Sequence, residues 1–176
     1  MGHIAAFTPW KLVMGILFAG SAPPASLKPR LEAAFGPADY QSPALAFTFT
    51  DYYKQEMGDS ISRCFMGFAN AVQPDLLADI KIMTNAIEEG YRAAPPAGRT
   101  VNLDPGLLSL SRFILATTKD NSHRIPLAKG IYAELTLRFT QKDFQVLPWT
   151  YPDYATREYR DILKEIREIY KEKLKR

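Results

Sequence analysis

The densest group of side chains that could do chemistry lies in residues 116–124. Lys119, Asp120, His123 and Arg124 supply an ammonium, a carboxylate, an imidazole and a guanidinium within this segment. Lys119 and Arg124 are suited to binding an anionic group, whereas Asp120 and His123 are suited to moving a proton. The alternative is a purely structural loop, in which Asp120 closes a turn and the other side chains are solvated or paired.

Two further acidic residues would strengthen this cluster if the fold brought them close to it. Glu134 lies on an expected strand, where it could act as a catalytic base, although an exposed strand face is the simpler explanation. Asp104 is a candidate ligand-binding residue, and its competing role is to cap a helix that follows it. Together with Asp120 and His123 these carboxylates would suit a divalent cation. Their spacing matches no diagnostic metal motif, so we assign no metal ligands and identify no cofactor.

A third set of candidate ligand-binding residues, Asp51, Tyr53 and Arg63, lies in the first half of the chain. Aromatic side chains beside carboxylates can hold a flat ligand, but tyrosine is also frequent at half-buried strand ends. Cys64 could be a nucleophile. Because it follows Arg63 in an expected strand, a role as a small buried apolar residue is the stronger expectation.

Hydrophobic periodicity predicts how the first half of the chain would position these residues. The apolar run 12–18 predicts a strand buried on both faces, and Leu27, Leu31 and Phe35 recur at helical spacing before a Gly-Pro stop. Further strands are expected at 45–50, 63–72 and 101–103, with a helix over 74–91. The order strand, helix, strand, strand, helix, strand is that of a split βαβ, ferredoxin-like unit.

The second half predicts a helix, a β-hairpin and a terminal helix. The apolar residues after Asp104 predict a helix over 105–115, and the short segment 128–130 separates two expected hairpin strands at 123–127 and 131–139. Residues 144–147 predict another strand. Apolar residues then recur from Tyr159 to Leu174 on one stripe, which predicts an amphipathic helix.

These elements predict an α+β fold in a single domain, with a ferredoxin-like first half. We expect residues 1–10 to be a mobile N-terminus, 11–154 to form the domain, and 155–176 to be an amphipathic helix packed on it. The Pro/Gly-rich stretch 94–98 predicts a loop rather than a domain boundary.

Composition and charge exclude several classes of protein. The chain has 176 residues, of which 47% are apolar and 23% charged, which is typical of a globular protein and not of a disordered one. A single cysteine excludes an intrachain disulfide. The net charge of +3 is carried by residues 157–176, where the two signs interleave, so nucleic acid is not an expected partner. The longest apolar run is too short for a membrane helix and no secretory signal is recognised, so no membrane partner and a cytoplasmic location are expected.

Several segments, taken in order, resemble a known family. They are Phe49-Thr50-Asp51-Tyr52-Tyr53, Asn102-Leu103-Asp104-Pro105-Gly106, Ala116-Thr117-Thr118-Lys119-Asp120, Ile131-Tyr132-Ala133-Glu134 and Leu147-Pro148-Trp149-Thr150-Tyr151-Pro152-Asp153-Tyr154. On these motifs the chain, from about residue 11 to 171, resembles the bacterial family catalogued as domain of unknown function 4416. The resemblance implies no particular activity and no catalytic residues. A P-loop GTPase is excluded, because the chain contains no Gly-Lys pair.

From the residues themselves we expect a protein that binds, and could hydrolyse or transfer, a small anionic or phosphorylated ligand in a cleft formed by residues 116–124. The alternative is a non-catalytic assembly module, in a homodimer or with another partner, that uses residues 149–154 and the C-terminal helix. The sequence leaves open whether the protein is an enzyme.

Overall fold

The computed structural model describes residues 2–93 and 98–175. A strand that is apolar on both of its faces lies at the centre of the sheet. This strand, β1 (Trp10–Ala19), is buried over eight consecutive positions. Leu12, Met14 and Phe18 point to one face of the sheet, and Val13 and Leu17 point to the other. Because neither face of β1 reaches solvent, apolar layers must cover the sheet on both sides.

The remaining elements build one open sheet around β1. They are α1 (Leu27–Phe35), β2 (Ala38–Gln41), β3 (Leu45–Ala46), α2 (Lys54–Met57), β4 (Ile61–Val72), η1 (Pro74–Leu76), α3 (Leu77–Glu89), β5 (Val101–Leu108), β6 (Arg112–Thr117), β7 (Arg124–Ala128), β8 (Ile131–Thr140), β9 (Asp143–Val146) and α4 (Arg157–Lys173). The described residues form a nine-stranded antiparallel sheet in the order β2-β4-β1-β5-β6-β8-β7, with β3 paired to β4 and β9 to β8. The fold is therefore a mixed, α+β arrangement.

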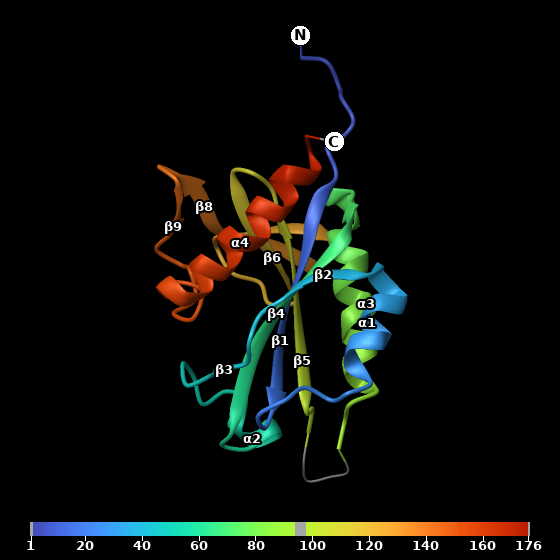
Figure 1. The fold of residues 1–176 in the computed structure, drawn as a ribbon, viewed down its shortest axis with the longest axis vertical. Coiled ribbons are helices and arrows are strands. Elements are labelled where there is room, and N and C mark those ends of the chain that lie inside the picture. The colour runs from blue at the N-terminus through green and yellow to red at the C-terminus, as the bar shows by residue number, and fades with distance from the viewer. Residues whose placement is uncertain (1, 94–97, 176) are drawn as a thin grey trace.

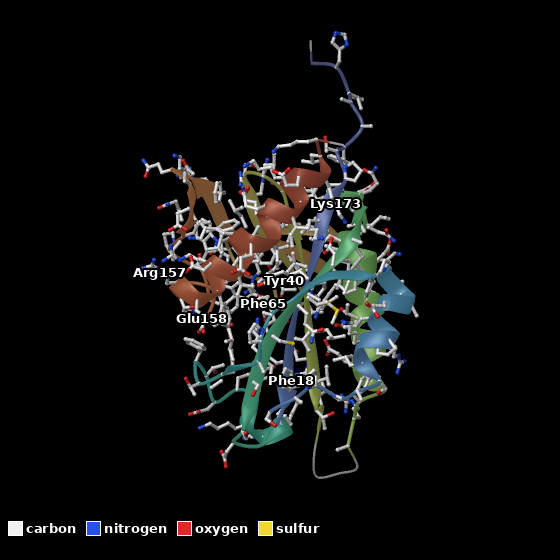
Figure 2. All side chains as sticks on the ribbon, viewed as in Figure 1. Phe18, Tyr40, Phe65, Arg157, Glu158 and Lys173 are labelled. Atoms are coloured by element: carbon white, nitrogen blue, oxygen red, sulfur yellow. The ribbon has the colours of Figure 1, made fainter. Side chains whose placement is uncertain are left out.

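Helices cover the two faces of the sheet unequally (Figure 1). α1 and α3 pack on one face, where Phe18 belongs to the core, and α4 packs on the other, where Phe65 lies (both labelled in Figure 2). α4 buries Tyr159, Ile162 and Ile166 against this face and exposes its charged side. No helix in the described parts of the chain combines the length and the apolar character needed to cross a membrane.

The helix expected over residues 105–115 is absent, because these residues form the end of β5, the turn 109–111 and the start of β6. A tight turn joins the strands, in which the Ser109 N–H donates to the Arg112 carbonyl at 2.9 Å. Backbone groups two residues apart point to the same edge of a strand. The nitrogen of Pro105 therefore faces the same edge of β5 as the Leu103 N–H. No strand pairs with this edge of β5 at that position, so the N–H that proline lacks is not needed for a sheet hydrogen bond. Asp104 lies in mid-strand and caps no helix.

Other elements agree with the sequence more closely. The expected hairpin is confirmed as β7 and β8, the strand after it as β9, and the terminal amphipathic helix as α4. The strand expected at 45–50 is only β3, because the chain then leaves the sheet and Phe47, Phe49 and Tyr53 pack edge to face. β2 is unexpected. The predicted loop at 94–98 falls, apart from Gly98, outside the described residues.

Candidate functional site

The sheet opens between β5 and β6. These strands pair only where Gly106–Leu108 faces Phe113–Leu115, so the first half of β5 has a bare edge. Two side chains of α3 satisfy that edge: Glu88 accepts the Leu103 N–H at 2.8 Å, and Lys81 donates to the Leu103 carbonyl at 2.8 Å. α3 therefore supplies partners for the Leu103 N–H and carbonyl, which no neighbouring strand pairs with.

A cavity of about 670 Å³ occupies this opening, a volume within the usual range for small-molecule sites. Its walls come from β4, β5, the end of β6, β8, the polar side of α3, the segment before α2, and the segment before α4. The lining residues are Phe47, Phe49, Thr50, Tyr52, Tyr53, Glu56, Arg63, Lys81, Asn85, Glu88, Glu89, Arg92, Arg99, Asn102, Asp104, Leu115, Ala116, Thr117, Thr118, Lys119, Glu134, Tyr151, Pro152, Asp153 and Tyr154.

A buried arginine organises the cavity floor. Arg63 donates to Asp104 at 2.9 Å and to the Tyr154 hydroxyl at 3.0 Å, and it lies 3.6 Å from Asp153. Burial alone would lower the pKa of Arg63, but the surrounding tyrosine and aspartate groups outweigh burial and raise it. Burial also raises the pKa of Asp153, although Arg63 opposes that change. The backbone leaves room for this cluster at Gly15, where a Cβ would lie 2.9 Å from the Tyr154 hydroxyl.

A second arginine extends the network along the floor. Arg99 donates to Glu56 at 2.7 Å, to Glu88 at 3.2 Å and to Asn102 at 3.1 Å. Asn102 in turn donates to Asp104 at 2.9 Å. Burial raises the pKa of Glu88, with Lys81 the main group opposing it. The floor is therefore a continuous chain of hydrogen bonds in which most charges are already compensated.

Asp104 is the most accessible charge of the Arg63 cluster. Its side chain is 24% exposed, against 3% for Arg63 and 8% for Asp153. Each Asp104 oxygen accepts one hydrogen bond, from Arg63 or Asn102, and a carboxylate oxygen can accept two. Asp104 can therefore accept a hydrogen bond from a ligand hydroxyl or amine in the cavity.

Aromatic side chains and one lysine form the rim. The Lys119 ammonium lies 4.1 Å from the ring centroid of Tyr52, and no carboxylate of the described residues lies within salt-bridge distance of it. Tyr53 lies deeper, where burial and the nearby Asp104 charge raise its pKa. Tyr151 also lines the cavity and accepts a hydrogen bond from Arg124 at 2.6 Å. The rim thus combines flat surfaces with an exposed cation.

The structure separates the residues of the 116–124 cluster. Lys119 lines the cavity, whereas Asp120 is exposed and is not among the lining residues. His123 binds Glu134 at 3.1 Å and stacks on Trp149, with ring centroids 5.3 Å apart. His123 is not among the lining residues either, so the geometry does not place this imidazole beside a ligand in the cavity.

Arg124 and Glu134 are paired with each other rather than exposed. Arg124 donates to Glu134 at 2.9 Å and to the Lys119 carbonyl at 2.8 Å. Glu134 is only 1% exposed, so the expected exposed strand face is wrong for this residue. A register shift between β6 and β8 beside residues 113–114 accompanies its burial. Glu134 contributes to the cavity wall, but its Oε2 atom is already shared by His123 and Arg124.

Of the candidate ligand-binding residues in the first half of the chain, two line the cavity and one does not. Tyr53 and Arg63 line the cavity. Asp51 does not: its side chain is 86% exposed and pairs with Lys54 at 2.7 Å. Cys64 is buried as expected, and burial raises the pKa of its thiol to about 11.

Sequence reasoning missed four residues of the floor, which are Glu88, Arg99, Asn102 and Asp153. They come from three parts of the chain, and no motif with a known chemistry contains them. One signal was available in α3, where Lys81, Thr84 and Glu88 lie among the buried positions of the helix. Polar residues within such a stripe indicate partners on the opposing surface. In the described parts of the chain, no three His, Cys, Asp or Glu side chains are grouped to hold a metal ion.

Comparison with known proteins gives one result. The family model described as Domain of unknown function (DUF4416) matches residues 8–170. Neither the curated proteins nor the solved structures contain a significant match to the chain.

Proposed function

The chain belongs to this family of unknown function, and we propose that it binds a small, hydroxyl-bearing molecule with one anionic group in the cavity between β5 and β6. The observation that carries the proposal is the pair of accessible charges on one cavity: the Asp104 carboxylate on the floor and the Lys119 ammonium at the rim. A sugar monophosphate has the matching chemistry, since its hydroxyls donate hydrogen bonds and its phosphate binds a cation.

The floor favours a hydroxyl-rich group over a second anion. Arg63 and Arg99 already bind carboxylates, and Asp104, Glu88 and Asp153 also line the cavity. An anion placed among these groups would meet carboxylates and no uncompensated cation, at a cost that burial increases. The anionic end of the ligand therefore belongs at Lys119, where solvent and the ammonium both stabilise it.

The other residues in and around the cavity take different roles in this proposal. Tyr52, Tyr53 and Tyr151 supply flat walls for a ring or carbon chain. Arg124 holds Tyr151 and the Lys119 backbone rather than the ligand. His123 and Glu134 act as positioning residues behind Arg124, and we assign no bond-breaking step to them.

We also propose that the unit from β1 to β5 is ferredoxin-like. The strand order β2-β4-β1-β5 and its antiparallel pairing support this assignment. So does the placement of α1 and α3 on one face of the sheet. The cavity would then lie where this unit meets the β6–β9 extension.

The assembly module has less support. α4 uses its apolar stripe to cover the sheet, so that stripe is not free for a partner. Trp149 and Tyr151 remain 37% and 39% exposed, which is the observation in favour of a partner surface. Trp149 nevertheless donates its indole N–H to the Leu135 carbonyl at 2.8 Å, as a docked structural residue does.

Thermal unfolding in the presence of sugars, their monophosphates and inorganic phosphate tests the proposal. A ligand that binds the native state raises the midpoint by mass action, and we expect sugar monophosphates to raise it more than either fragment. Lys119→Gln should weaken binding about tenfold, the effect of losing about 1.4 kcal/mol. Lys28→Gln, on the exposed side of α1, is the matched control and should bind as wild type. No response to any sugar or sugar phosphate would overturn the proposal.

A further inference from the structure

Two arginines face each other at the other end of β6. Arg112 of β6 lies directly opposite Arg138 of β8 in the antiparallel ladder. Directly opposed residues of antiparallel strands project their side chains to the same face and lie close together. Like charges in this arrangement repel each other, so the pair costs stability unless something compensates it.

Nothing in the described residues neutralises this pair. Neither arginine has a carboxylate within salt-bridge distance there. The contrast lies on the same strand β8, where the cross-strand partner of Arg124 is Glu134 and the two form an ion pair at 2.9 Å. Arg112 is placed instead over the Trp10 ring, 5.4 Å from its centroid.

A shallow cavity of about 450 Å³ adjoins the two guanidinium-bearing residues. It is lined by Ser111, Arg112, Leu135, Arg138, Phe139 and Thr140. Two arginines and two hydroxyl residues supply donors around it and no carboxylate belongs to its lining. This composition is the reverse of the β5–β6 cavity, whose lining holds six carboxylates among its charged groups.

We propose that the Arg112–Arg138 cavity binds a phosphate group of a small soluble molecule. Arginine forks match the oxygens of a phosphate, and a dianion would convert the repulsion between the two guanidinium groups into shared attraction. The site is independent of the proposed sugar phosphate site. Arg112 begins β6 and Thr117 ends it at the first cavity, a separation of roughly 17 Å along the strand.

Thermal unfolding of the full chain in inorganic phosphate, and in chloride at matched ionic strength, tests the proposal. Without phosphate, Arg138→Gln should unfold at or above the wild-type midpoint because it removes the repulsion, whereas Arg112→Gln also loses the contact with the Trp10 ring. Phosphate should raise the wild-type midpoint and leave both variants nearly unmoved, which reverses the order of stability of wild type and Arg138→Gln.

Two control variants separate this site from other sources of a phosphate response. Arg157→Gln removes an arginine at the start of α4 (Figure 2) whose side chain is 89% exposed, and it should retain the full phosphate shift. Lys119→Gln should retain it too, because Lys119 belongs to the first cavity. A phosphate shift no larger than that of chloride, or one that survives in Arg138→Gln, would overturn the proposal. Binding to phosphatidic acid vesicles without a response to soluble phosphate would also overturn it.

Discussion

Replacing Arg63 with methionine should destabilise the fold strongly, because Arg63 is the centre of the cavity floor. The substitution keeps a long apolar stem but removes the charge that Asp104 and Asp153 share, at 2.9 and 3.6 Å. It also removes the hydrogen bond to the Tyr154 hydroxyl and the contacts of the guanidinium with the rings of Phe47 and Tyr154. Two carboxylates would then remain at the floor without their cation.

The expected cost is about 3–5 kcal/mol, the range for removing one partner of a buried ion pair. Arg63 and Asp153 are 3% and 8% exposed, so water cannot replace the lost partner, whereas Asp104 at 24% exposure recovers part of its hydration. The free energy of unfolding of a typical domain is about 5–15 kcal/mol. The variant should therefore fold but lose a large share of its stability.

The cost should also depend on pH. Burial raises the pKa of Asp153 and Arg63 opposes this rise, so the variant should have a still higher pKa at Asp153. A folded state that binds its proton more readily than the unfolded chain gains stability as pH falls toward the ordinary aspartate pKa. The difference between wild type and Arg63→Met should therefore shrink between pH 7 and about pH 4.5.

Urea unfolding followed by circular dichroism at these two pH values measures both effects. Arg63→Met combined with Asp153→Asn should recover part of the loss at pH 7, because it removes one uncompensated charge. Arg157→Met on the surface should leave the free energy of unfolding unchanged. A cost below about 1 kcal/mol at pH 7, typical of an exposed pair, would refute the reasoning that Arg63 organises the floor.

Three further predictions concern other parts of the core. Asp39→Asn leaves Lys11, which is 1% exposed, without its anion, and should cost about 2–3 kcal/mol at pH 7. Burial would raise the pKa of Asp39, but hydrogen bonds from Lys11 and Lys173 outweigh burial and lower it from the ordinary aspartate value. In urea titrations this advantage of the wild type should therefore persist at pH 4.5 and disappear only as the pH falls through the lowered pKa. The Cys64 thiol, buried with a pKa raised to about 11, should react with a disulfide reagent at pH 8 only on unfolding; rapid native-state labelling would contradict its burial. Gly15→Ala would place a Cβ 2.9 Å from the Tyr154 hydroxyl and should cost about 1–3 kcal/mol in urea unfolding, whereas a neutral result would show that the floor can move aside.

The sequence predicts well the elements whose pattern is local. The hairpin around Gly130, the apolar strand β1 and the stripe of α4 follow from spacing alone. The helix expected after Asp104 fails, because Asp-Pro is a typical helix start and also fits a strand with a bare edge. β5 has an edge without a strand partner because β6 pairs with only part of it, and Lys81 and Glu88 of α3 bond to that edge instead. No local sequence pattern predicts this arrangement. β2 has little apolar alternation and is tied to α4 by Tyr40 and Glu165, in contact at 2.6 Å.

The site is predictable only in part, because it too depends on contacts between residues that are distant in the sequence. Tyr53, Arg63 and Asp104 are selected by residue type, and the fold brings them to one cavity. Lys119, Asp120 and His123 are selected because they lie close together in the sequence, and of these three only Lys119 lines the cavity. Nearness along the chain therefore identified a polar loop, whereas the polar floor is assembled from residues that are distant in sequence.

Calorimetric titration of two ligands into two proteins tests most directly whether Lys119 and the cavity hold an anionic, hydroxyl-bearing molecule. The ligands are the sugar monophosphate with the largest thermal shift and its unphosphorylated parent, and the proteins are wild type and Lys119→Gln. We expect removal of the phosphate or of the lysine to weaken binding about tenfold, and removal of both to weaken it no further, because the two groups contact each other. Losses that simply multiply, or equal binding to both proteins, would contradict the proposed site.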